Sequence, residues 1–444
     1  MRLSPALLAV PLLLAALAGC SGPKSSPSGA GPGGAAASDP WPAVQTTMKD
    51  VPCDATVGGG TSPNLVLLSN VTYAEEAGSH GELDLRGHLA VHARYSAGGF
   101  ELVDIADPLA PKDLGAFDYN GENQSGNAFD VKFAPDNQTV LVGLRDAILL
   151  ADVSDPLHPY EVSRWMKGDN SAIEDPANAQ EWNAHMLYSA RIADKDWVFL
   201  APNTSSGVWI LQLTGAGAAR KLTYVTQTLP LEGGPLGPHD MYVQKDEKDG
   251  RWYLYSADGV HGWTVFDVDD PAKPSMVGGW TNPAEGAYTH TIQAAWVNGR
   301  RLVATIGEVG VNILKVYDAT DLRTPLLLGI YTITPGPGSA GPASPEHNFN
   351  IVGGKLYMSY YTHGMYIFDL AKLGSVPVAG TAQLQPVAHW DIGGESAVPG
   401  LFGGIWDTVL QDGVIYLSNI QGGLFVVGYG CNGPYPNASL TSTG

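Results

Sequence analysis

The chain has 444 residues, of which only 15% are charged, and it carries a formal net charge of -20. This strongly negative balance excludes nucleic acid and anionic lipid headgroups as expected partners. The chain is rich in valine, leucine, isoleucine, tryptophan and tyrosine, and it has 55 glycines and 32 prolines. It has no long segment with charged residues at helical spacing. Such a composition is typical of an all-β protein.

The first residues have the features of an export signal. Arg2 supplies a positive start, and residues 6–17 form an apolar stretch that is too short to span a bilayer. The stretch ends in Leu17-Ala18-Gly19-Cys20, which resembles the lipobox of bacterial lipoproteins. The resemblance implies a signal peptide over residues 1–19 and acylation of Cys20, and a plain secretory peptide is the alternative. Ser21 stands where Asp would signal inner-membrane retention, so the outer membrane or cell surface is favoured.

Residues 20–45 are expected to form a flexible tether that begins at the lipidated cysteine. They are mostly Gly, Ser, Ala and Pro, which cannot bury enough apolar surface to offset the entropy of ordering. One folded domain is expected over residues 46–436, followed by a C-terminal tail over residues 437–444. No later apolar stretch is long enough for a transmembrane helix, so the lipid would be the sole membrane attachment.

Seven segments repeat one pattern: an apolar strand, an Asp-Pro-type turn and a second apolar strand. The clearest copies are residues 99–108, 147–156 and 262–271, and weaker copies begin at Gly207, Gly310, Gly364 and Gly423. Their spacing of about 40–60 residues is in the range of propeller blades. We therefore expect a seven-bladed β-propeller, in which an early strand at residues 64–69 completes the last blade and removes a free edge. A six- or eight-bladed count stays open, because the third unit is irregular.

Each unit is interpreted as four strands, named A to D from the channel outward. Strand D of the sixth unit is expected at residues 376–383. Strand C of the seven units is expected at residues 100–104, 147–152, 208–213, 263–267, 311–317, 365–369 and 424–428.

Three segments of the sequence resemble a known family. Residues 100–108, 366–369 and 347–361 resemble the LVIVD-repeat family of exported bacterial and archaeal propeller proteins. The similarity covers about residues 80–428, although units three and seven depart from its strand C motif. It implies a seven-bladed propeller and a largely uncharacterised activity.

Cys53 and Cys431 lie just before the first repeat strands and just after the last. In an oxidising compartment they are candidates for a disulfide that clasps the ring. Such a bond would contribute roughly 2–5 kcal/mol. Two unpaired thiols are the alternative.

A polar residue recurs at the start of strand A, the innermost strand of each unit. The aligned residues are Glu82, Asp130, His185, His239, His290, His347 and Asp407. Propeller pseudo-symmetry predicts one cluster at the channel mouth. Imidazole is a common ligand of zinc, copper and iron, so His185, His239, His290 and His347 are candidate ligands for one transition metal ion, Cu, Fe or Zn.

Long loops lead into several A strands, and such loops usually mark the binding face of a scaffold. The turns between strands B and C lie on that same face. Candidate binding residues there are Asp130, Arg145, Asp240, His261 and His363. Glu308 and Asp407 are candidates for a general acid or base beside a metal.

Two functions remain in competition. The first is a lipid-anchored binding or scaffold protein of the cell envelope, with an unidentified envelope protein or small ligand on the long-loop face. The second is a metal-dependent oxidase or hydrolase with a four-histidine site on the propeller axis. Carotenoid oxygenases and the selenium-binding/methanethiol oxidase family are similar only at the level of the fold. Strand A histidines that merely bond neighbouring backbone are the structural alternative.

Overall fold

The computed structural model describes residues 65–73, 80–118, 127–145, 147–166, 183–202, 207–230, 237–281, 288–308, 313–332, 346–375, 382–390 and 403–430. The expected signal peptide, Cys20, the tether, Cys53, Cys431 and the C-terminal tail lie outside these residues. No helix in the described part of the chain is long and apolar enough to cross a membrane.

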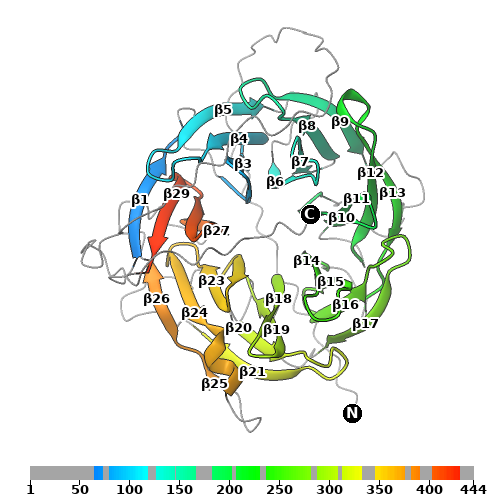
Figure 1. Ribbon diagram of the computed structural model, residues 1–444, viewed down its shortest axis with the longest axis vertical. Coiled ribbons are helices and arrows are strands. Elements are labelled where there is room, and N and C mark those ends of the chain that lie inside the picture. Colours follow the sequence, from blue (N-terminus) through cyan, green and yellow to red (C-terminus); the bar gives the residue numbers. More distant parts are fainter. Residues whose placement is uncertain are drawn as a thin grey trace, which may run out of the picture. The chain divides into compact units, whose positions relative to one another are not determined.

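Seven antiparallel sheets follow one another around a ring in chain order, so the fold is a seven-bladed β-propeller (Figure 1). Blade one consists of β2 (Leu83–Arg86), β3 (Leu89–Ala93), β4 (Gly99–Asp104) and β5 (Lys112–Asp118). Blade two consists of β6 (Ala128–Phe133), β7 (Thr139–Leu144), β8 (Ala147–Asp152) and β9 (Tyr160–Met166). Blade three consists of β10 (Met186–Ile192), β11 (Lys195–Ala201), β12 (Trp209–Thr214) and β13 (Lys221–Gln227), with a 3-10 turn at Gly217–Ala219.

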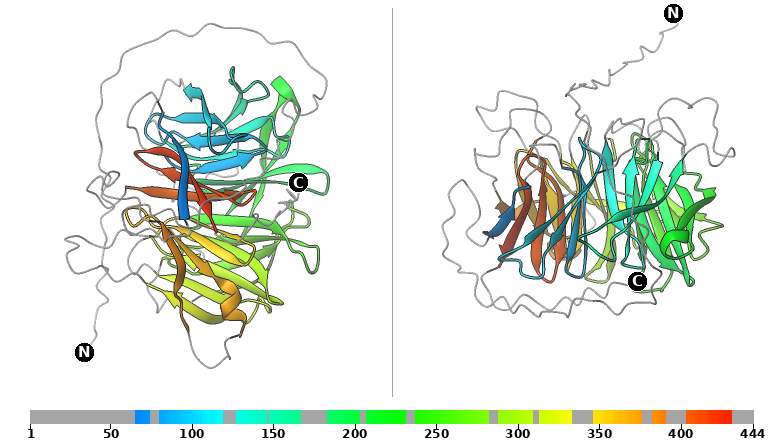
Figure 2. Two further views of the ribbon diagram at one scale, coloured as in Figure 1. Left: turned by 60° about the vertical axis from the view of Figure 1, so that its left-hand side comes forward. Right: turned by 90° about the horizontal axis from the view of Figure 1, so that it is seen from above.

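The remaining blades repeat this order, and their strands run between the two faces of the ring (Figure 2). Blade four consists of β14 (Asp240–Lys245), β15 (Trp252–Ala257), β16 (Trp263–Asp267) and β17 (Ser275–Trp280). Blade five consists of β18 (Thr291–Val297), β19 (Arg300–Ile306), β20 (Leu314–Asp318) and β21 (Leu326–Tyr331). Blade six contains β22 (Phe349–Val352), β23 (Lys355–Ser359) and β24 (Met365–Asp369), and blade seven contains β27 (Ile405–Gln411), β28 (Val414–Asn419) and β29 (Gly423–Tyr429).

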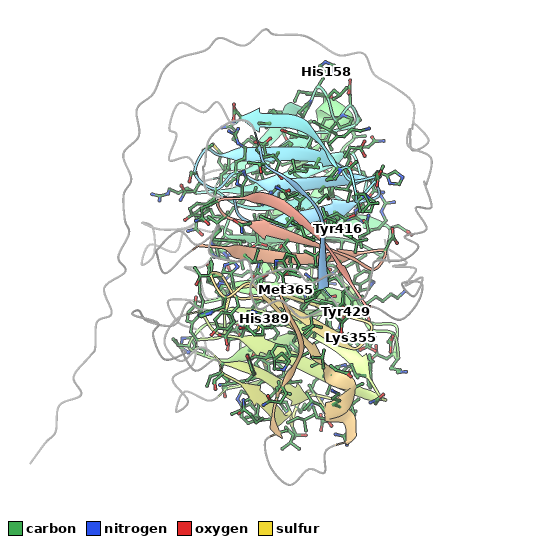
Figure 3. The ribbon with its side chains drawn as sticks, turned by 90° about the vertical axis from the view of Figure 1, so that its left-hand side faces the viewer. His158, Lys355, Met365, His389, Tyr416 and Tyr429 are labelled. Atoms are coloured by element: carbon green, nitrogen blue, oxygen red, sulfur yellow. The ribbon has the colours of Figure 1, made fainter. Side chains whose placement is uncertain are left out.

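The ring closes through β1 (Leu65–Val71), which pairs antiparallel with β29 from Leu65 opposite Tyr429 to Val71 opposite Leu424. The expected outer strand of blade seven is therefore confirmed. Figure 3 shows this side, with β1 in blue and Tyr429 of β29 and Met365 of blade six labelled. A buried hydrogen-bond chain adds to the closure.

In that chain, the hydroxyl of Tyr73 lies 2.9 Å from His92 Nδ1, and His92 Nε2 lies 2.7 Å from the hydroxyl of Ser418. Tyr73 follows β1, His92 belongs to blade one and Ser418 belongs to blade seven. The two ends of the described chain are therefore joined by side chains as well as by a β-ladder.

Blade six differs from expectation at its outer strand. The predicted position at residues 376–383 is wrong, because β26 (Pro386–Trp390) pairs with β24 there. Residues Ala382–Gln383 instead form β25, which extends blade five by pairing parallel to β21. The 3-10 helix Leu370–Ser375 replaces the short Asp-Pro turn of other blades and carries the chain outward.

The repeated aspartate at the end of strand C fixes the following turn. In blade one, Asp104 Oδ1 accepts a hydrogen bond from the backbone N–H of Ala106 at 3.0 Å. Asp152, Asp267, Asp318 and Asp369 each accept the same bond from the residue two positions on. An Asx turn of this kind is the local reason for the repeat. Buried strands B and C of neighbouring blades then pack into apolar clusters between the sheets.

Candidate functional site: an aromatic crown at the channel mouth

Each blade contributes one aromatic or imidazole side chain to a closed circle. The circle lies on the face of the propeller where the innermost strands begin. We call this set the crown: Tyr95, Phe129, His185, His239, His290, His347 and Trp406. Ring centroids are 4.3, 4.0, 4.7 and 4.2 Å apart in the order His185, His239, His290, His347 and Trp406. The circle continues from Trp406 to Tyr95, Phe129 and His185 at 5.7, 5.6 and 5.3 Å.

The crown has two unlike halves. The histidine arc is formed by blades three to six: His185, His239, His290 and His347. The aromatic arc is formed by blades seven, one and two: Trp406, Tyr95 and Phe129. Centroid spacings are shorter along the histidine arc, so its ring nitrogens are close enough to act together.

The expected single ring of histidines and carboxylates is wrong in its alignment. The ladders have register shifts between Ala128 and Asp130 and between Ile405 and Asp407. Asp130 opposite Gly143 and Asp407 opposite Ser418 have the register of Asp240 opposite Ala257, so the preceding residues Phe129 and Trp406 occupy the positions equivalent to the histidines. Blade one has Gly81 at this position, and Tyr95 at the end of its second strand completes the circle.

The carboxylates form a second ring, one residue further along the innermost strands. Asp130 bonds to Lys132 and accepts the N–H of Leu187 at 2.6 Å, which ties blade two to blade three. Asp407 accepts the N–H of Leu83 at 3.3 Å and so ties blade seven to blade one. These contacts give both aspartates a role in joining blades. A catalytic role for Asp407 stays a prediction.

Below the crown, the second ring lines a cavity of about 260 Å³ on the channel axis. Asp240, Asp407 and Glu82 contribute to its wall, as do Lys132 and Arg86. Burial raises the pKa of Glu82 well above its usual value, and the adjacent Asp407 carboxylate raises it further. Protonation of Glu82 is favoured in this setting. Burial also raises the pKa of Asp240 to about 7.

Glu308 lies where the middle of the histidine arc can reach it. Its Oε2 is 3.2 Å from His290 Nε2, and its Oε1 is 3.9 Å from His347 Nε2. One ligand atom each from His239, His290 and Glu308 lie within 4.8 Å of one another. Burial alone would raise the pKa of Glu308, but the charge of His290 and their mutual hydrogen bond lower it below its usual range. The carboxylate is consequently ionised.

The hydrogen bonds of two arc histidines fix their tautomers. His347 Nδ1 lies 2.8 Å from the carbonyl oxygen of Trp406, which can only accept, so Nδ1 carries the hydrogen. His290 Nδ1 lies 2.8 Å from the hydroxyl of Thr291, which has two acceptors for its own hydrogen, Asn348 Oδ1 at 2.9 Å and the carbonyl oxygen of His347 at 3.2 Å, so we assign the hydrogen between Nδ1 and the hydroxyl to Nδ1. In their neutral forms both rings therefore present an Nε2 lone pair toward Glu308.

The other half of the arc also presents Nε2 atoms to one another. His185 Nε2 and His239 Nε2 are 2.8 Å apart. Burial lowers the pKa of His185 to about 4 and that of His347 to about 3, and it lowers the pKa of His239 strongly. These imidazoles are therefore neutral at pH 7, which is the form that binds a metal ion.

Tyr361 supports Glu308 from blade six. Its hydroxyl donates to Glu308 Oε1 at 2.8 Å. Its backbone has φ of +37°, a left-handed value that is unfavourable for a bulky side chain. Blade four has Gly259, with φ of +59°, at the equivalent bridge. Blade six thus keeps a tyrosine where glycine would be unstrained, at a cost of order 1–3 kcal/mol.

Three further candidate residues lie around the crown. Arg145 is exposed at the end of strand B of blade two, the position equivalent to Tyr95 and Glu308. His261 and His363 lie half-buried in B–C turns, where their backbone N–H groups bond to Asp258 at 3.0 Å and to Tyr360 at 2.8 Å. The structure therefore brings Glu308 to His239, His290 and His347 and leaves His261 and His363 in turns outside the crown.

Sequence reasoning missed Tyr95, Phe129, Trp406 and Tyr361. Phe129 and Trp406 directly precede the aligned aspartates, so an aromatic residue before Asp was the available signal. Tyr95 comes from a different strand, and Tyr361 is 53 residues from Glu308. No spacing rule connects them.

Comparisons with known proteins identify the fold and nothing finer. No family model matches the chain, and no curated protein matches it. A candidate 6-phosphogluconolactonase from Bacteroides uniformis is similar with a TM-score of 0.51 and 11% identity, over 68% of this chain and 81% of that one. The computationally designed protein Ika8 gives a TM-score of 0.48 and 11% identity, over 81% and 98%. The dihydro-heme d1 dehydrogenase NirN gives 0.45 and 14%, over 77% and 62%.

Proposed function

We propose that this propeller binds one transition metal ion at the crown, with His239, His290 and Glu308 as its ligands. His185 and His347 lie beside these three and are available to complete the coordination. Two imidazoles and one carboxylate are a ligand set used for zinc and for iron(II), and a third or fourth imidazole also suits copper. Binding and presenting such an ion is the function that we assign to the channel mouth.

The observation that carries this proposal is the close approach of the His290 Nε2 atom to a carboxylate oxygen of Glu308. His290 Nε2 lies 3.2 Å from Glu308 Oε2, so a protonated His290 forms an ion pair with the carboxylate, whereas a neutral His290 directs an unprotonated Nε2 at it. Two lone pairs at this distance repel unless a cation lies between them. A proton on His290 is one such cation, and a metal ion is the other. A metal ion would in addition have a nitrogen of His239 within reach, because one ligand atom each of His239, His290 and Glu308 lie within 4.8 Å of one another.

A metal-dependent enzyme is a second candidate, and the strained Tyr361 favours it. Strained backbone persists where the surrounding structure imposes it, often at sites with chemical work to do. Tyr361 holds the Glu308 carboxylate by one oxygen. Three protein ligands would leave a coordination position open, which a catalytic metal needs and a structural metal does not.

The cellular setting belongs to the same proposal. Cys20 would carry a lipid and the following residues would tether the propeller to the outer membrane or cell surface. The crown face would then meet a small ligand or an envelope protein. The net charge of -20 supports neither nucleic acid nor an acidic partner. Membership of the LVIVD-repeat family is part of this proposal too.

Metal analysis of the purified full chain tests the proposal. We expect about one zinc, iron or copper ion per chain, and almost none in the double variant His239→Ala/His290→Ala. The matched control is His158→Ala, because His158 is exposed on a blade two turn beside Asp155 (Figure 3). A wild-type protein that takes up none of the three metals would contradict the proposal, as would equal uptake by the double variant.

A further inference from the structure

The aromatic arc lies directly beside the proposed metal site and has no role in holding the ion. Trp406 packs on His347 with centroids 4.2 Å apart, and Phe129 meets His185 edge to face at 5.3 Å. Tyr95 bridges the two, with centroids 5.7 Å from Trp406 and 5.6 Å from Phe129. These three side chains contribute no nitrogen or carboxylate ligand, yet they complete the circle around the mouth.

The aromatic arc is also less completely buried than the histidine arc. Tyr95 and Trp406 are half-buried and Phe129 is 8% exposed, whereas His239, His290 and His347 are 5%, 1% and 3% exposed and His185 alone of the histidine arc is half-buried. Gly81 brings no side chain to the crown position of blade one. Tyr95 and Trp406 are therefore a part of the crown that a small molecule can still contact, together with His185.

One cation beside the arc, the Arg145 guanidinium, can pair with an acidic ligand group. Arg145 lies near enough to Tyr95 to lower the pKa of its phenol, against the larger effect of burial and the opposing charge of Glu308. Arg145 is exposed, and it occupies the position in blade two that Glu308 occupies in blade five. A ligand between the arcs would thus have the ion on one side, aromatic faces on the other and a guanidinium at the rim.

We propose that the aromatic arc is a binding wall for a small aromatic molecule with an acidic oxygen, of the phenol, catechol or aromatic carboxylic acid class. Its oxygen would bind the open position of the metal ion, and its ring would lie against Trp406 and Tyr95. This inference rests on the proposed metal site. It adds the substrate class, which the metal ligands alone do not define.

Cobalt-substituted full chain and two probes test the inference. 4-Nitrocatechol has an aromatic body and acidic oxygens, and azide is an anionic metal ligand without a ring. Binding of each probe is followed by its effect on the visible spectrum of cobalt(II). In Tyr95→Ala and in Trp406→Leu, we expect the dissociation constant of 4-nitrocatechol to rise about 10-fold, because ring contacts are lost.

Azide and a distant aromatic residue are the controls. Azide affinity should change by less than about 2-fold in both variants, since azide contacts only the ion and its surroundings. Tyr160→Ala should leave both probes unaffected, because Tyr160 is 47% exposed on the outermost strand of blade two. Tyr95→Phe separates the phenol hydroxyl from the ring, and retained 4-nitrocatechol affinity in this variant assigns the contact to the ring.

The outcomes separate the two proposals. Cobalt uptake with azide binding, but with no effect of either substitution on 4-nitrocatechol, overturns the inference and leaves the metal site standing. Parallel losses for azide and 4-nitrocatechol in Tyr95→Ala also overturn it, because they show a disturbed metal site. A wild-type chain that takes up no cobalt overturns the proposed function and this inference together.

Discussion

The four histidines, Phe129 and Trp406 occupy equivalent positions of their blades, with Tyr95 filling the place that Gly81 leaves open in blade one, and yet the two arcs differ in chemistry. His185, His239, His290 and His347 present nitrogen lone pairs, whereas Trp406, Tyr95 and Phe129 present ring faces. The propeller fold supplies seven similar positions at the same mouth. The difference between the arcs shows that a pseudo-symmetric scaffold need not use its repeated positions alike. One part can hold an ion while the adjoining part contacts what the ion binds.

The sharpest test of this division exchanges one residue of each arc. His290→Phe makes the histidine arc aromatic, and we expect metal affinity to fall by about 100-fold or more, since a direct ligand is lost. Phe129→His adds an imidazole to the other arc and should change affinity by less than about 3-fold. Isothermal titration of the metal-free chains with zinc measures both. If Phe129→His restored affinity to His290→Phe, the two arcs would be interchangeable and the division would be wrong.

A smaller loss of zinc affinity is expected when the hydrogen bond from Tyr361 of blade six to Glu308 is removed. Tyr361→Phe removes the hydroxyl that donates to Glu308 Oε1 and keeps the ring. Loss of such an outer contact typically weakens metal binding by about 10–100-fold. Tyr360→Phe, one residue earlier, is the matched control and should leave zinc affinity unchanged. Equal zinc affinities for wild type and Tyr361→Phe would show that Glu308 is oriented without the tyrosine.

The smallest expected effect is a pH dependence of folding stability that comes from the histidine arc and not from the aromatic arc. Burial lowers the folded-state pKa of His185 to about 4 and that of His347 to about 3, below the ordinary value near 6.5. Between each folded-state pKa and pH 6.5, the unfolded chain binds more protons than the folded one. The free energy of unfolding therefore rises with pH in this range, and it is lost progressively as the pH falls below about 6.5. We expect each of these histidines to cost on the order of 1 kcal/mol at pH 5 relative to pH 7 in the metal-free chain.

Denaturant unfolding of the metal-free protein at the two pH values measures this loss. His185→Phe should reduce the difference between pH 7 and pH 5, whereas Phe129→Leu in the aromatic arc should leave it unchanged. A pH dependence that is the same in wild type and His185→Phe would mean that His185 is not held neutral by the fold.

Most of the fold could be predicted from the sequence because its signals are local. An aspartate at the end of strand C bonds to the backbone two residues later, as Asp104 does, and this contact needs no distant partner. The strand at Leu65–Val71 was recognisable because the seventh unit lacked an outer strand. Blade six was mispredicted at its edge because the 3-10 helix after Asp369 delays the outer strand until Pro386.

The site was less accessible to sequence reasoning, for two physical reasons. The carboxylates Asp130 and Asp407 share the register of Asp240 and not that of His239, and a one-residue difference of this kind cannot be read from hairpins of unequal length. Glu308 and Tyr361 belong to different blades, and only the packing of those blades brings their side chains to 2.8 Å. The histidines and Glu308 could be named as candidates from their places at the strand ends. The contact of Glu308 with Tyr361 could not.

Closure through β1 also constrains the order in which the molecule can fold. Leu65 pairs with Tyr429, so the first described strand finds its partner only when the last one has been made. Contacts that close so long a loop form late and slowly, because their entropic cost precedes any gain. During synthesis, six blades can assemble from local hairpins while the seventh waits. A chain cut short before β29 would therefore leave β1 without its partner, and exposed strand edges are the usual starting point of aggregation.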